Sequence, residues 1–307
     1  MNELESSVST AEKPDWKKLL VFLGILAACF FVGNLVLALL AMAAGLPLTE
    51  DLDIFGAISD EETKPFIKTA IGLNHLIIFT GTALFYAIWA KKEKWLGYFD
   101  WVKVDFGLLI LFVALLICAY PIITASATIF EDVEWVQQMD ETNLEALMQV
   151  MEMSGGFDLF VNLIIIGLLP AIGEELLFRG VIQKELITKF SSSHFAIILT
   201  SIIFAAVHLQ IQGFFPKLFI GLILGYAYYW TRSLWYPIVL HFLNNAIPTV
   251  MLFLAGDQIE AMQEEAIKPE KVHLLIGVVF SFFLCIFLIR IIRKQIDENK
   301  SPTTENG

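Results

Sequence analysis

The chain has 307 residues, of which 57% are hydrophobic and 13% aromatic, and its mean hydropathy is +0.70. This composition is more apolar than that of an ordinary soluble domain, so the chain is not expected to be one. The formal net charge is −12, and there is no Gly-rich phosphate loop or cluster of Lys and Arg, so a nucleic-acid partner is excluded as well.

Apolar stretches recur along the chain, several of them longer than the roughly 20 residues that cross a hydrocarbon core of about 30 Å. They predict an all-α fold, namely a polytopic membrane helix bundle with about eight transmembrane helices. The fifth stretch is the shortest of the eight. The expected spans are about 18–45, 66–90, 106–130, 158–178, 194–211, 215–231, 234–255 and 272–292.

The predicted organisation is a single membrane domain at 18–293. It is flanked by a cytoplasmic N-terminal tail at 1–17 and a cytoplasmic C-terminal tail at 294–307. The first span is too long for the apolar core of a signal peptide, and no small-residue cleavage site follows it. The three cysteines fall in three different spans without metal-ligand spacing, so they are interpreted as small apolar side chains.

The basic residues predict the orientation of the bundle. With the N-terminus inside and eight spans, 15 of the 20 Lys and Arg residues lie in inner segments, as the positive-inside rule requires. Both termini are therefore expected in the cytoplasm. Short tails without retention signals are typical of a multi-pass protein of the bacterial inner (cytoplasmic) membrane.

Three ionisable side chains lie within six residues at the end of the fourth span, namely Glu174, Glu175 and Arg179. An intramembrane charge costs roughly 2.5–3.5 kcal/mol on insertion scales, so such groups persist when they pair or do chemistry. Glu175 and Arg179 are four residues apart and are expected to form an ion pair on one helix face. Glu174 points about 100° away and is expected to face a cavity. There, burial of an unpaired carboxylate suits it to act as a general base. The alternative is that all three are solvated among the headgroups.

Two later apolar segments each carry a histidine. His208 follows Phe204 by four residues and His241 precedes Asn245 by four, so each pair shares a helix face. A lone intramembrane histidine commonly serves only as an interhelical hydrogen bonder. Three polar clusters in one bundle favour a joint site with Glu174. His208 lies late in the short fifth span, so its depth fits this site least well.

The three motifs Glu-Glu-xxx-Arg, Phe-xxx-His and His-xxx-Asn, in this order on successive spans, resemble the CPBP family of intramembrane proteases. This family includes type II CAAX prenyl endopeptidases and bacterial Abi proteins of bacteriocin processing and self-immunity. The resemblance covers about 158–250, the expected protease core. It implies hydrolysis of a membrane-associated peptide or protein substrate, CAAX-like or bacteriocin-type. It also implies that Glu174 and His208 activate water while His241 and Asn245 assist. Residues Glu175, Arg179 and Phe204 are the supporting positions of the pattern.

Two mechanisms fit these residue types. In one, that of a metalloprotease, Glu174, His208 and His241 hold Zn²⁺ with a water in the open position. In the other, Glu174 and His208 deprotonate water without a metal, and His241 and Asn245 donate hydrogen bonds to the oxyanion. The sequence lacks the His-Glu-xx-His helix of the zincins, so zinc is a tentative cofactor.

Two other functions are compatible with the same residues. A non-catalytic membrane binding or immunity protein would sequester a peptide, and a transporter would use the carboxylates and histidines as a proton relay. The polar clusters fall only in the second half of the chain, which argues against the inverted repeat of a transporter. An enzyme is the favoured interpretation.

Polar and small residues elsewhere receive structural interpretations. Asn74 and His75 in the second span are expected to form interhelical hydrogen bonds. Gly221 and Gly225 have the spacing of a close helix crossing. Pro170 is expected to kink the helix that carries Glu174.

Overall fold

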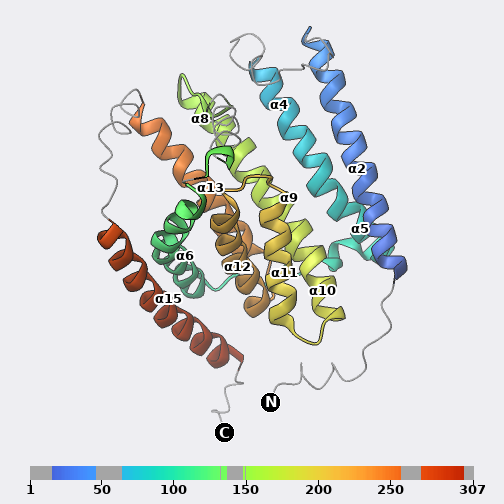
Figure 1. The fold of residues 1–307 in the computed structure, drawn as a ribbon. Helices are drawn as coiled ribbons and strands as arrows, with labels where there is room; N and C mark the ends of the chain where they lie inside the picture. The colour runs from blue at the N-terminus through green and yellow to red at the C-terminus, as the bar shows by residue number, and fades with distance from the viewer. Residues whose placement is uncertain are drawn as a thin grey trace. The chain divides into compact units, whose positions relative to one another are not determined.

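The computed structural model describes the chain as α-helical, with no strand among the residues it describes, which are 16–45, 64–131, 133–136, 148, 150–256 and 271–300. The helical segments are shown in Figure 1. They are α2 (Trp16–Ala43), α4 (Lys64–His75), η1 (Leu76–Gly81), α5 (Thr82–Lys91), η2 (Lys92–Tyr98), α6 (Phe106–Ala127), η3 (Thr128–Phe130), α8 (Gly156–Asn162), η4 (Leu163–Leu168), α9 (Leu169–Leu177), η5 (Phe178–Gln183), α10 (Lys184–Lys189), α11 (Ser193–Ala206), α12 (Phe214–Thr231), α13 (Trp235–Ala255) and α15 (Lys271–Lys300).

The described residues fall into two compact units. α11 begins in the first unit and ends in the second, whereas α13 begins in the second unit and contributes His241–Leu254 to the first. The first unit is drawn from Met1–Asp100, Glu141–Thr200 and His241–Leu254, and the second from Trp101–Asp140, Ser201–Leu240 and Ala255–Gly307.

The first unit is built on two long helical runs, Lys64–Tyr98 and Gly156–Lys189. α2 packs along the first run, and α9 of the second run packs against η1 of the first. Both runs contain π-helical turns, which are rare and frequently mark functional sites. The three π-turns, η1, η4 and η5, lie beside the residues of the candidate site described below.

The second unit packs α6 against α12 and α15. Asp105 caps the N-terminus of α6, because its side chain accepts a hydrogen bond of 3.0 Å from the backbone N–H of Leu108. A Cβ on Gly221 of α12 would lie 3.1 Å from the Cβ of Ser201 on α11, so the predicted close crossing is confirmed. The buried apolar cluster of this unit comprises Leu108, Phe112, Leu115, Leu116, Ala119, Ile123, Ile220, Leu224, Ala227, Tyr236, Leu240, Ile292 and Ile296.

The predicted multi-pass membrane helix bundle is confirmed, whereas the number of eight spans stays a prediction. α11 has 14 residues, or about 21 Å at 1.5 Å per residue, which is shorter than a hydrocarbon core. α12 has 18 residues, but a lysine near its start and three tyrosines near its end lower its hydropathy. Six described helical runs are long and apolar enough to cross a membrane, namely Trp16–Ala43, Lys64–Tyr98, Phe106–Phe130, Gly156–Lys189, Trp235–Ala255 and Val272–Asn299.

The predicted tails and single membrane domain also stay predictions. Residues 1–15 and 301–307 lie outside the described part of the chain, and α15 continues to Lys300.

Candidate active site

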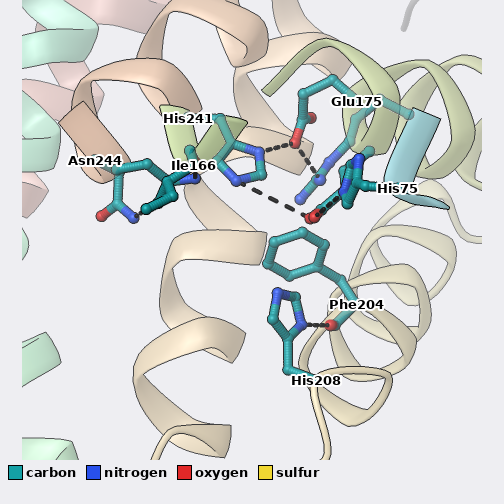
Figure 2. A network of polar contacts seen from close by, with 10 residues as sticks. His75, Ile166, Glu175, Phe204, His208, His241 and Asn244 are labelled. Atoms are coloured by element: carbon teal, nitrogen blue, oxygen red, sulfur yellow. Dashed lines mark hydrogen bonds and ion pairs between the residues drawn. The ribbon is translucent and has the colours of Figure 1, made fainter. Parts of the chain in front are cut away.

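Glu175, Arg179 and His241 form a buried polar network in the first unit (Figure 2). Oε1 of Glu175 lies 2.7 Å from Nη1 of Arg179 and 2.8 Å from Nδ1 of His241. Glu175 and Arg179 are completely buried, and His241 is 4% exposed. The ion pair predicted from the i, i+4 spacing is therefore confirmed, and its carboxylate also holds a histidine from α13.

The hydrogen bond to Glu175 defines the state of the His241 ring. A carboxylate only accepts, so His241 donates through a protonated Nδ1. The other ring nitrogen, Nε2, then faces the neighbouring carboxylate, with 4.0 Å between it and Oε2 of Glu174. The two adjacent glutamates, expected to act separately, thus approach opposite nitrogens of one imidazole.

Glu174 also lies beside a histidine that the motif analysis does not assign to the site. Its Oε1 is 3.0 Å from Nε2 of His75, the last residue of α4. The expectation that Glu174 stands unpaired is therefore wrong, whereas the interhelical hydrogen bond expected of His75 is confirmed. In the sequence, the polar pair Asn74-His75 inside an apolar span indicates an interhelical contact. It does not indicate that Glu174 is the partner.

A close approach between α9 and η1 makes this contact geometrically feasible. A Cβ on Gly173 would lie 2.7 Å from Oγ1 of Thr80 and 3.4 Å from Cε1 of His75. Real Cβ atoms do not tolerate a contact under 3.0 Å, so any larger residue would push α9 and η1 apart. A glycine immediately before Glu174 is thus part of how this fold brings His75 to the carboxylate.

Asn245 joins α13 to the turn before α9. Its Nδ2 donates a hydrogen bond of 3.1 Å to the carbonyl of Ile166. Pro170 lies four residues after Ile166 and has no N–H, so it cannot supply the usual α-helical hydrogen bond to that carbonyl. The Asn245 amide satisfies the carbonyl instead, as neighbouring helices commonly do for proline-interrupted membrane helices.

Replacing Asn245 by leucine is expected to destabilise the protein by about 1–3 kcal/mol, because it leaves a partly buried carbonyl without this donor. Thermal unfolding in detergent measures the change. Asn244→Leu is the matched control on the adjacent residue, whose amide donates to the Asn245 side chain. Equal losses for the two variants would contradict the bridging role of Asn245.

His208 and Phe204 belong to the second unit, with Phe204 near the end of α11 and His208 in the turn that follows it. Nδ1 of His208 lies 2.8 Å from the carbonyl of Phe204, and the two rings are 5.1 Å apart (Figure 2). Nδ1 therefore carries the proton, which makes Nε2 the basic nitrogen. The joint action of His208 with Glu174 stays a prediction, because each unit is described by itself.

The donor set does not fit a metal centre among the described residues. No group of three or more His, Cys, Asp or Glu side chains in that part of the chain is arranged to hold an ion. Glu174, Glu175, His75 and His241 are instead joined to one another. The zinc site of Glu174, His208 and His241 therefore stays a prediction.

Comparison with known proteins gives a family for one part of the chain. Residues 156–247 match the family model described as type II CAAX prenyl endopeptidase Rce1-like. This range contains all three motifs and excludes His75. No solved structure matches significantly.

Two curated bacterial relatives match a similar fraction of the chain. The uncharacterized protein YpbD of Bacillus subtilis (strain 168) is 34% identical over 90 residues, which are 28% of this chain and 43% of YpbD. The membrane-embedded CAAX protease MroQ of Staphylococcus aureus (strain USA300) is 32% identical over 99 residues, 30% of this chain and 40% of MroQ. The chain thus spans less than half the length of either relative. The three motifs and these matches therefore agree on the CPBP family for the segment 156–247.

Proposed function

We propose that the protein is an intramembrane endopeptidase that hydrolyses a peptide bond of a membrane-associated peptide or protein. The observation that supports this most directly is the buried approach of Glu174 to His241. Oε2 of the carboxylate lies 4.0 Å from Nε2 of the imidazole, inside membrane-spanning helices. A general base and a second polar group converge there in an apolar surrounding, as hydrolysis requires.

The 4.0 Å separation suits a bridging water. Hydrogen bonds to water are about 2.8 Å long, so a water placed off the line between the two atoms reaches both. Glu174 would take a proton from this water as its oxygen attacks the scissile carbonyl. The same proton would then pass to the leaving amine, so that one water and one peptide bond become a carboxylate and an amine.

The remaining family positions take supporting roles in this proposal. His208 is the second group that activates water. His241 and Asn245 stabilise the oxyanion. His241 would do so through a hydrogen on Nε2 in addition to the one that Nδ1 donates to Glu175, and Asn245 has a second amide hydrogen besides the one directed at Ile166. Glu175 and Arg179 hold His241 in place through the buried network.

The substrate proposed first is a prenylated peptide of the CAAX type, because the relative MroQ is named as a CAAX protease. The test uses purified protein in lipid vesicles and a farnesylated peptide with a CAAX-type end, beside the same peptide without the lipid. Mass spectrometry of new termini should show cleavage of the lipidated peptide. Cleavage of neither peptide would contradict this substrate class, and binding without cleavage would favour a sequestering immunity protein.

The metal is tested in the same assay. If zinc takes part, cleavage should stop on exhaustive chelation and return with added Zn²⁺, and metal analysis should find close to one ion per chain. Cleavage that persists at negligible metal content would support the carboxylate mechanism alone.

We further propose a bacterial inner membrane location with both termini in the cytoplasm. The six runs that meet the length criterion and the eight predicted spans are both even numbers, so either places the termini on one side. Reporter fusions to the two ends should both report the cytoplasm; opposite sides would contradict this layout.

A further inference from the structure

We propose that His75 is a positioning residue for Glu174, supplied from outside the family segment at 156–247. Its ring holds one carboxylate oxygen so that the other is presented to water beside His241. The inference rests on the proposed role of Glu174 as general base, but the contact itself can be measured without any cleavage.

The two oxygens of Glu174 have different neighbours. Oε1 lies 3.0 Å from Nε2 of His75, whereas Oε2 lies 4.0 Å from Nε2 of His241. The first distance is that of a direct hydrogen bond, whereas the second is too long for one. The carboxylate is therefore held by His75 at one oxygen, and its other oxygen faces His241.

The surroundings of Nδ1 indicate which nitrogen of the His75 ring carries the hydrogen. Nδ1 is buried and has no hydrogen-bond partner among the described residues. A buried N–H without a partner is more costly and rarer than a buried acceptor without one, so the hydrogen resides on Nε2. His75 thus donates Nε2–H to Oε1 of Glu174.

The fold restrains the His75 ring from several sides. The ring stacks on Phe79 with centroids 4.4 Å apart and an interplanar angle of 18°. Its Cε1 packs close to Gly173 of α9, where an added Cβ would lie 3.4 Å away. His75 also sits where α4 passes into the π-turn η1, and its side chain is 18% exposed. A ring held this way can fix the rotamer of Glu174.

Fixing that rotamer matters for the proposed reaction. A glutamate side chain has three rotatable bonds, and a misplacement of about 1 Å can cost 10²-fold in rate. The charged and titratable groups near Glu174 include His75 from α4, His241 from α13, and Glu175 and Arg179 from its own helical run. The hydrogen bond between His75 and Glu174 spans 3.0 Å.

The kinetic test compares His75→Leu with His75→Gln, because the glutamine amide places a donor near the position of Nε2. Cleavage of the farnesylated peptide in vesicles should lose about 10²-fold in kcat in His75→Leu with KM nearly unchanged. His75→Gln should recover most of the loss. The matched control is His194→Leu at an exposed histidine, which should keep the wild-type rate.

A second measurement tests the contact independently of activity. Unfolding temperatures are compared for His75→Leu, Glu174→Leu and the double variant. The shift of the double variant should be clearly smaller than the sum of the two single shifts, because the hydrogen bond is lost only once. If the shifts are additive, His75 does not hold Glu174 and the inference fails.

The two measurements separate this inference from the proposed function. Coupled unfolding temperatures with an unchanged kcat in His75→Leu would reduce His75 to a packing residue. Should the wild type itself cleave nothing, the proposed function fails, and the unfolding cycle still decides whether His75 holds Glu174.

Discussion

Arg179→Met is expected to lower the free energy of unfolding by about 3–5 kcal/mol, because removing one partner of a buried ion pair leaves an uncompensated buried charge. Arg179 and Glu175 are both completely buried, and 2.7 Å separates Nη1 from Oε1. In the variant, the Glu175 carboxylate keeps His241 but loses its cationic partner. Chemical or thermal unfolding in detergent measures the loss.

Two further variants make this prediction specific. The double variant Glu175→Leu/Arg179→Met removes both charges and should recover much of the stability, since apolar replacement of a whole buried pair is often near neutral. Lys294→Met removes an exposed i, i+4 partner of Glu298 and should have no measurable effect. If Arg179→Met proves as stable as Lys294→Met, the buried network does not hold the fold together.

Glu174→Gln is expected to lower the cleavage rate by about 10²–10⁴-fold, the usual contribution of a general base. Glutamine keeps the shape of the side chain, and its carbonyl oxygen can still accept the hydrogen bond from His75. The unfolding temperature should therefore change little. Rates must be expressed per folded protein, so cleavage and unfolding are measured on the same preparation.

Glu175→Gln is the matched control on the neighbouring residue. It removes the charge that Arg179 faces at 2.7 Å, so its main effect should be lower stability or yield. The pair of variants distinguishes the base from the structural carboxylate. A stable but inactive Glu175→Gln beside an active Glu174→Gln would reverse the two roles.

The sequence predicts those features of the site that depend on local spacing. The i, i+4 rule is enough for the ion pair of Glu175 with Arg179, because both lie on one continuous helical run. Apolar lengths likewise predict the membrane helix bundle. α11 ends at Ala206, before the predicted boundary at 211, and Leu209 adopts a left-handed backbone with φ of 54° that an α-helix cannot contain.

Contacts between segments that are far apart in the sequence cannot be predicted from helical spacing or apolar length. His75 and Glu174 are 99 residues apart, and their hydrogen bond depends on how closely Gly173 lets α9 approach η1. Residue type alone suggests an oxyanion donor at Asn245. Its bond to Ile166, 79 residues earlier, becomes understandable only when Pro170 is seen to lack the N–H that this carbonyl would use.

The most direct test of the central claim is product analysis in ¹⁸O-labelled water with the wild type and Glu174→Gln. Both proteins are incubated in vesicles with the farnesylated CAAX-type peptide, and bound and released peptides are identified by mass spectrometry. The wild type should release a fragment whose new carboxyl end carries one ¹⁸O atom, whereas Glu174→Gln should retain the intact peptide. Equal release of labelled fragment by both proteins would contradict the assignment of Glu174 as the base that activates water.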